Sequence, residues 1–288
     1  MTATIKTTNL QHGSASSANI VLASDGTSDV VGSFQRGHIA GLALSYSNTT
    51  TFGIAVGSAT ASDGTTSMTL SSAYTKTTGS WAVGTGNGAL DTGSVTTSTW
   101  YHVYLIKRSD TGVVDVLLST SATAPTMPSN YDLKRRIGAI KTDGSSQIIN
   151  FTQVEDTFYW AAAVLDINNT APTADTTTAG TLSVPTGVKL RPLIRGFSVP
   201  NLGNGALIIR SPDMPDESPI VSTTGSSPWS AKPGADMDTS GNTSRENHIA
   251  RFSDLYTNTS AQIYYREKIG NCVQIVTYGW VDSRGRFE

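Results

Sequence analysis

Cysteine and charge are both scarce in this chain. Cys272 is the only cysteine among 288 residues, which excludes an intrachain disulfide and a cluster of thiolate metal ligands. Charged residues make up only 15% of the chain, and its formal net charge is −2. A chain of this charge does not neutralise phosphates on the scale that nucleic-acid binding requires, so we expect no nucleic-acid partner.

Long apolar runs are also missing. No segment approaches the ~20 apolar residues of a membrane-spanning helix, and residues 1–14 lack the basic and apolar regions of a secretory signal peptide. No basic amphipathic helix indicates binding to a membrane surface. We therefore expect a protein made in a cytoplasm, with no membrane insertion.

Glycine, serine and threonine, by contrast, are plentiful, and the apolar residues occur in short runs. This composition is typical of all-β proteins. Asp-Gly, Thr-Gly and proline turn signals separate the runs, and no helical period of useful length is present. We predict an all-β fold, an antiparallel β-sandwich of jelly-roll-like form.

Residues 99–140 are predicted to form the centre of the sheet. Both alternating faces of residues 100–107 are mostly apolar, which indicates a strand covered on both sides. The chain then reverses in a turn where Gly112 takes a positive φ. In the return strand apolar and polar residues alternate, with Asp115 and Ser119 on the polar face, so we predict a half-buried strand near an edge.

Several other segments carry fold predictions. Residues 75–97 are polar and glycine-rich apart from a few anchors, so we expect a long loop pinned by Trp81. Pro192 predicts an edge position or a bulge, because proline donates no backbone hydrogen bond. Residues 212–247 are expected to be a long irregular stretch, followed by a strand at 249–256.

We predict two parts, an N-terminal arm at residues 1–35 and a β-sandwich body at residues 36–288. The arm contains a strong strand at 19–23 but is too short to bury a core alone. Residues 168–180 are the best candidate for an internal boundary within the body. A long sandwich loop is the alternative for that segment.

Patterns that suggest catalysis are each weak. Residues 84–88 have the glycine spacing of a phosphate-binding loop, but the sequence that follows cannot begin the helix that would hold the anion. No nucleophile elbow occurs, and His102 lies among large aromatics, which predicts a buried, hydrogen-bonded histidine. Glycan hydrolysis requires two acids across a cleft. The available acids all fit turns or solvated faces: Asp110, Asp115, Asp213, Asp216 and Glu217.

Residues 236–241 copy the opening of an EF-hand calcium loop. Position twelve of that loop is Asn247 instead of glutamate, and no helices flank it. The alternative is a turn-rich loop whose aspartates bond to their own backbone. We therefore predict no enzymatic activity, no catalytic residues, no cofactor and no metal site.

Three aromatic residues in loop contexts, Trp81, Tyr131 and Trp229, are candidates for contact with a receptor. An aromatic ring packs on the C–H face of a sugar while neighbouring polar groups orient the hydroxyls. Each ring fits the alternative role of an anchor that holds its loop. A carbohydrate-binding, receptor-recognition module is accordingly one candidate function, with a host surface glycan as its partner.

Six stretches carry a resemblance to a known group of proteins. They are IKTTNLQHGSASSANIVLASDG near the N-terminus, the central hairpin with WAVGTGNGALDTG before it and PTMPSNYDLKRRIGAI after it, and NTSAQIYYREK and IVTYGWVDSRGR near the C-terminus. Together they resemble tail-fibre-like and other virion structural proteins of tailed bacteriophages. The resemblance lies in the amino-acid sequence along these stretches, and none of them carries a catalytic signature.

The resemblance implies a virion protein made in the host bacterial cytoplasm. It implies a surface-exposed tail fibre or tail appendage, with a capsid-bound head fibre or decoration protein as the alternative. Other virion proteins of the tail or capsid would be its partners, and it implies a homotrimer with a role in host attachment. Charge-poor, doubly apolar strands suit such subunit packing.

The arm resembles a segment that recurs ahead of unrelated bodies in phage structural proteins, which implies attachment to the virion. We expect Leu10, Ile20, Val21 and Leu22 to anchor it by burying apolar side chains against a partner. The alternative is that residues 1–35 form an edge hairpin of the main sandwich.

Overall fold

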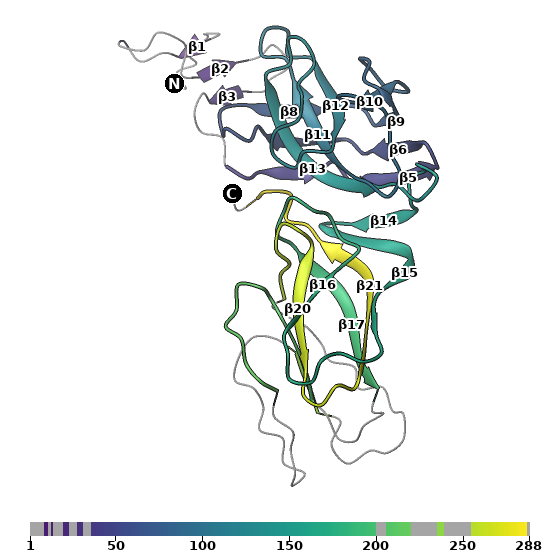
Figure 1. Ribbon diagram of the computed structural model, residues 1–288. Helices are drawn as coiled ribbons and strands as arrows, with labels where there is room; N and C mark the ends of the chain where they lie inside the picture. The colour runs from purple at the N-terminus through teal and green to yellow at the C-terminus, as the bar shows by residue number, and fades with distance from the viewer. Residues whose placement is uncertain are drawn as a thin grey trace.

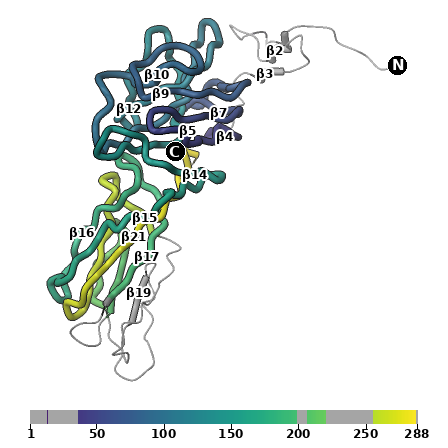
Figure 2. Tube along the Cα trace, turned by 90° about the vertical axis from the view of Figure 1, so that its right-hand side faces the viewer, coloured from purple at the N-terminus to yellow at the C-terminus, as the bar shows by residue number. Residues whose placement is uncertain are grey.

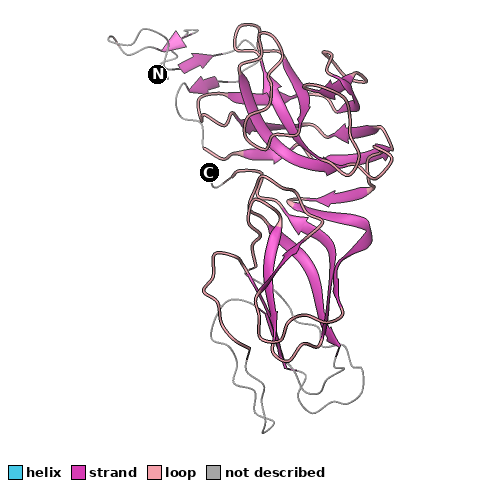
Figure 3. Ribbon diagram, viewed as in Figure 1, coloured by secondary structure: helices cyan, strands magenta, loops and turns pink. Residues whose placement is uncertain are grey.

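The structure, a computed structural model, describes residues 36–198, 206–219 and 255–286 in full, and the backbone of Val199. It also describes Gly13 and the backbone of four short strands outside these ranges. Every regular element among the described residues is a β-strand (Figure 3). The all-β prediction is therefore confirmed.

Eleven strands form one large, bent sheet that runs through the whole body (Figure 1). In spatial order they are β13 (Leu133–Lys141), β11 (Trp100–Lys107), β12 (Val114–Ser119), β10 (Gly88–Leu90), β9 (Tyr74–Ser80), β6 (Thr51–Ile54), β5 (Leu44–Asn48), β14 (Phe151–Val154), β15 (Thr157–Asn169), β21 (Cys272–Val281) and β17 (Arg191–Val199). The strands up to β14 build the upper part of the body in Figure 1, and β15, β21 and β17 build the lower part. Neighbours pair antiparallel, except that short β10 pairs parallel with β9 and β12.

Two smaller sheets pack against this large sheet and complete the sandwich. One contains β4 (Ile39–Gly41), β7 (Gly57–Thr60) and β8 (Ser67–Leu70), and the other contains β16 (Thr178–Thr181), β20 (Gln262–Glu267), β18 (Ala206–Arg210) and β19 (Ala235–Asp238). Strand β8 lies against β11 and β12, while β16 and β18 lie against β15 and β17. Figure 2 shows β16 and β17 on opposite sides of the lower part. The core therefore lies between sheets in both parts of the body.

The predicted central hairpin is confirmed in its strand positions and in its turn. Strand β11 is buried over almost its whole length, and Gly112 in the turn has φ of 74°. The prediction that β12 is half-buried near an edge is wrong. Strand β12 pairs with β11 on one side and β10 on the other, and both of its faces are covered. The second face is covered by side chains from distant loops, which alternation along β12 does not reveal.

The long loop predicted at 75–97 is also wrong in part, because it contains β9 and β10. Strand β9 consists mainly of threonine, lysine and glycine, so it lacks the apolar alternation that predicts a strand. Its pairing with β6 provides the backbone partners that stabilise it. Trp81 follows β9 directly and starts the remaining loop.

Aromatic side chains join the upper and lower parts of the body. The Trp280 ring of β21 stacks on Phe158 of β15 at 5.0 Å between centroids, and it meets the edge of Trp100 of β11 at 5.3 Å. Trp160 packs against both Trp100 and Trp280. Such aromatic pairs stabilise beyond their burial by about 0.5–1.5 kcal/mol each. This cluster fixes β11 to the β15–β21 pair.

A buried ionic network continues this junction toward the C-terminus. Arg136 of β13 donates to both carboxylate oxygens of Asp282, at 2.9 and 2.6 Å, and its Nε donates to Nδ1 of His102. Arg284 and Arg286 both pair with Asp156 in the β14–β15 turn. His102 is thus the buried, hydrogen-bonded histidine that its aromatic surroundings predicted.

The remaining segment predictions have mixed outcomes. Strand β17 contains Pro192, lies at the edge of the large sheet and shifts register after Leu193, as predicted. Residues 168–180, the candidate boundary, contain the end of β15, the connection at residues 170–177 and the start of β16, all within the lower part. The irregular stretch predicted at 212–247 includes β19, and of the strand predicted at 249–256 only residues 255 and 256 are described, outside any strand.

The arm forms a three-stranded antiparallel sheet of its own, with β1 (Asn9–Leu10), β2 (Ile20–Leu22) and β3 (Ser28–Val30) in that order. Among the described strands, these three pair only with one another.

Candidate functional site

An open groove of about 390 Å³ lies beside β12 in the upper part of the body. Its wall combines the Trp81 indole and Met127 with small polar residues and one carboxylate. The lining residues are Ser80, Trp81, Leu90, Asp91, Thr92, Gly93, Thr126, Met127, Pro128 and Ser129. They come from two segments, one from the end of β9 to just past β10 and one between β12 and β13, that are far apart in the sequence.

Trp81 forms the aromatic wall of the groove and is held in place from below. Its Nε1 donates to the carbonyl oxygen of Val116 on β12 at 3.2 Å. The Tyr131 ring meets the indole edge to face, with 5.3 Å between ring centroids. Trp81 stays partly exposed, whereas only 7% of Tyr131 is exposed. Two of the three aromatic residues predicted to contact a receptor therefore meet, but only Trp81 lines the groove.

Met127 and Tyr131 also explain why the second face of β12 is buried. They pack with Tyr104, Ile106 and Leu117 into a small apolar cluster on the side of the sheet away from the main core. This cluster forms a rigid floor under Trp81. A fixed aromatic wall is pre-organised for a ligand, because little side-chain freedom is lost on binding.

A fully buried ion pair lies beneath the same loop. The Lys76 ammonium of β9 is 2.8 Å from the Asp115 carboxylate of β12, and both side chains are 0% exposed. The ammonium also donates to the carbonyl oxygens of Ala82 and Gly84, at 2.8 and 2.9 Å. Asp115 accepts from the backbone N–H of Gly84 at 2.7 Å. The pair therefore ties the loop after Trp81 to the sheet.

Asp115 was predicted to lie on a solvated face, and this is wrong. Alternation along β12 identifies its polar face correctly, but residues from β9 and the loop after it cover that face. Residues 84–88, whose glycine spacing was not expected to bind phosphate, use backbone groups of Gly84 for contacts within the protein. The Gly84 N–H already binds an internal carboxylate, and the Gly84 carbonyl binds an internal ammonium.

Burial shifts the ionisation of two groups near the groove. It lowers the pKa of Lys76, although the hydrogen bond and the charge of Asp115 act in the opposite direction. It raises the pKa of Tyr131, and the Asp115 charge raises it further. Tyr131 is therefore a neutral phenol at pH 7, and its role is to pack against Trp81.

The chemistry of the groove suits binding better than hydrolysis. Asp91 is the single carboxylate among its described lining residues, and it accepts from the backbone N–H groups of Thr92 and Thr126, at 2.8 and 3.0 Å. Glycosidases require a pair of carboxyl groups about 5–10 Å apart across the scissile bond. One carboxylate that holds two loop segments does not provide such a pair.

The other acids considered for hydrolysis do not gather at one place. Asp110 pairs with Arg108 in the β11–β12 turn, whereas Asp213 and Asp216 pair with Lys189 and Arg210 in the lower part. Asp236 and Asp238 lie in β19, where the backbone is extended and pairs with β18, unlike a calcium-binding loop. Among the described residues, no group of three or more histidine, cysteine, aspartate or glutamate side chains is placed to hold a metal ion.

The remaining predicted site residues are the four anchors of the arm and Trp229. Leu10 lies in β1, and Ile20, Val21 and Leu22 form β2, so all four predicted anchors belong to the arm sheet. Trp229 lies outside the described residues. Lys76, Asp91 and Met127 were not identified from the sequence, because each stands alone in a polar or proline-rich stretch with no periodic signal.

The comparisons with known proteins gave no relative: no protein-family model, curated protein or solved structure matches this chain. Within the part of the chain that the structure describes, no helix has the length and apolar character needed to cross a membrane.

Proposed function

We propose that this chain is a non-catalytic structural protein of a tailed-phage particle, exposed on the particle surface as a tail fibre or tail appendage. The context comes from the resemblance of its N-terminal, central and C-terminal stretches to virion proteins. The observation that supports the arrangement best is the separate sheet of β1, β2 and β3, which adds no strand to the sandwich.

A separate sheet of three short strands fits an attachment arm. Strands of two or three residues bury little surface by themselves, so such a sheet gains stability when it adds strands or apolar side chains to a partner. In this proposal Leu10 and residues 20–22 pack against another virion protein. The body then extends outward and presents the Trp81 groove. A capsid-bound head fibre or decoration protein would use the arm in the same way.

Assembly of particles tests the anchoring. We expect a chain that begins at residue 36, and the full-length double variant Ile20→Asp/Leu22→Asp, to be lost from purified particles. The matched control is Val113→Asp, which changes an exposed side chain in the β11–β12 turn region of the body. Quantitative immunoblots of particles and of the soluble fraction give the readout. Normal incorporation of both altered arms would contradict the proposal.

The groove favours a second candidate function, recognition of a surface carbohydrate. Trp81 offers a partly exposed indole on a rigid floor, and hydroxyl groups and Asp91 surround it. Stacking on sugar C–H surfaces together with polar contacts to hydroxyls is the usual basis of such binding. A glycan array tests it with Trp81→Ala, with Tyr256→Ala as the control because Tyr256 is an exposed aromatic residue away from the groove.

The array separates the two functions and also detects an enzyme. Retention of a glycan that Trp81→Ala abolishes supports recognition, and release of shorter products would identify a glycan hydrolase instead. Absence of binding by the wild type leaves the structural role and removes the second candidate.

We also propose that the protein assembles as a homotrimer. Strands β14 and β15 carry exposed apolar side chains, with Val154 56%, Tyr159 40% and Leu165 51% exposed. Exposed apolar side chains that gather on one face are common at protein–protein contacts. Multi-angle light scattering measures the mass, and a stable monomer at micromolar concentration would contradict this assignment.

A further inference from the structure

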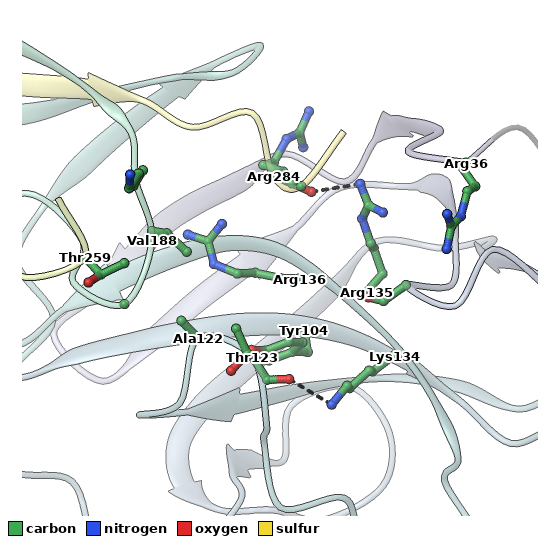
Figure 4. A pocket seen from close by; sticks show the side chains of 14 residues that line it. Arg36, Tyr104, Ala122, Thr123, Lys134, Arg135, Arg136, Val188, Thr259 and Arg284 are labelled. Atoms are coloured by element: carbon green, nitrogen blue, oxygen red, sulfur yellow. Dashed lines mark hydrogen bonds between the residues drawn. The ribbon is translucent and has the colours of Figure 1, made fainter. Parts of the chain in front are cut away.

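A second cavity, of about 500 Å³, lies where the upper and lower parts of the body meet. Its wall is strongly cationic. Six basic side chains line it: Arg36, Lys134, Arg135, Arg136, Lys189 and Arg284. No carboxylate belongs to the described residues of the wall. Figure 4 shows the five arginine and lysine side chains that it labels, Arg36, Lys134, Arg135, Arg136 and Arg284, around the cavity, together with Tyr104, Ala122 and Thr123.

The basic residues come from segments that are distant in the sequence. Lys134, Arg135 and Arg136 are consecutive residues of β13, whereas Arg284 follows β21 and Lys189 precedes β17. The fold, and not one basic run, therefore creates the concentration of charge. Since the chain has a net charge of −2, this local excess of cations is unlike the rest of the molecule.

Three carboxylates offset part of this charge. Asp282 pairs with Arg136, Asp156 pairs with Arg284, and Asp213 pairs with Lys189. None of the three carboxylates is among the lining residues of the cavity, whereas all three of their cation partners are.

Hydrogen bonds hold several of the cations in fixed positions. Arg136 donates to both oxygens of Asp282 and to His102, and Arg135 donates to the carbonyl oxygen of Arg284 at 2.9 Å. The Lys134 ammonium donates to the carbonyl oxygen of Thr123 at 2.9 Å. Arg135 and Arg136 are only 5% and 8% exposed. Cations that are partly desolvated and close together repel one another, and an anion between them would remove that repulsion.

We propose that this cavity binds a small multivalent oxyanion, an organic molecule that carries at least two phosphate, sulfate or carboxylate groups. Guanidinium groups match the geometry of these groups and bind them through two parallel hydrogen bonds, and lysine adds a compact charge. The volume lies within the usual range for small-molecule sites, about 300–1,000 Å³, and exceeds the size of one inorganic phosphate. A free metabolite anion and an acidic saccharide share this chemistry.

Calorimetric titration of the full chain tests the proposal with pyrophosphate, citrate and a sulfated, carboxylated heparin disaccharide. Sodium chloride at matched ionic strength corrects for screening. We expect saturable binding of at least one of these anions. The double variant Arg36→Gln/Lys134→Gln should bind it at least about tenfold more weakly, because two contacts with a charged group are lost. Preference for the disaccharide indicates a saccharide source, and preference for pyrophosphate or citrate indicates a free anion.

Arg195→Gln is the matched control, because Arg195 is an exposed basic residue of β17 that does not line the cavity. It should bind like the wild type. If the double variant does not fold, as judged by near-UV circular dichroism, Lys189→Gln at the exposed rim replaces it and should weaken binding about threefold. No saturable heat with any of the anions, or equal weakening by Arg195→Gln, would overturn the proposal.

Discussion

Removing one partner of the buried Lys76–Asp115 pair should destabilise the protein strongly. Asp115→Asn keeps the shape of the side chain but leaves the Lys76 ammonium without a counter-charge, and both positions are 0% exposed. Breaking a buried pair in this way costs about 3–5 kcal/mol, because an uncompensated charge stays buried. That is a large part of the roughly 5–15 kcal/mol that stabilises a typical domain. The expected drop in Tm is on the order of 10 °C.

A double-mutant cycle identifies the pair as the cause. Urea unfolding measures the free energy of unfolding of Asp115→Asn, Lys76→Met and the double variant. The double variant should lose at least about 2 kcal/mol less of this free energy than the two single variants lose together. The double variant no longer buries a charge, although the carbonyl oxygens of Ala82 and Gly84 lose their donor. Asp110→Asn, in the exposed pair with Arg108, is the control and should leave the midpoint nearly unchanged.

The pH dependence gives an independent check. Burial already lowers the pKa of Lys76, and removal of Asp115 takes away the interactions that raise it. The unfolded chain then binds more protons than the folded one between the folded pKa and the ordinary value near 10.4, so stability rises with pH in that window. The difference in free energy of unfolding between the wild type and Asp115→Asn should therefore shrink as pH rises from 7 toward 10. A constant difference, or additive losses, would refute the role assigned to the pair.

Three more predictions concern other parts of the body. Burial, followed by the charge of a neighbouring guanidinium, lowers the pKa of His102 to about 3, so stability should fall as pH falls from 6.5 toward 3. His102→Gln should reduce that slope by up to about 1.4 kcal/mol per pH unit in urea unfolding, and identical slopes would contradict this assignment. A Cβ on Gly279 would lie 2.1 Å from a backbone oxygen of β15, so Gly279→Ala should cost roughly 3 kcal/mol, whereas Gly144→Ala meets no atom within 4 Å and should cost little. Equal urea midpoints for these two variants would show that a Cβ at position 279 does not clash with the backbone of β15. Leu165→Glu should lower the assembled mass in light scattering while Val113→Glu leaves it unchanged, and equal masses would exclude this face as the contact.

Local patterns predicted the parts of the fold that depend on neighbours in sequence. The doubly apolar run of β11 and the turn at Gly112 each specify a strand or turn through a few adjacent residues. Strand β9 lacks such a pattern, because it is polar and its pairing with β6 stabilises it. Pairing between distant segments has no signature in a single sequence.

The same limit applies to the candidate sites. Trp81 and Tyr131 were each recognised as aromatic residues in loops, but their contact joins positions fifty residues apart. The polar face of β12 was recognised, yet alternation does not show whether a loop covers that face, and Asp115 was misplaced for this reason. The cationic cavity depends on residues from β13, the segment before β17 and the segment after β21, which only the folded chain brings together.

Under the proposed function a tailed phage encodes this chain, and cryo-electron tomography of the particles of that phage tests this central claim most directly. A gold-labelled antibody against residues 36–288 marks the body. The proposed function predicts that the label lies on the particle surface, at the tail if the protein is a fibre or appendage and at the head if it decorates the capsid. Particles without label, from a lysate in which the antibody detects the protein only in the soluble fraction, would contradict it.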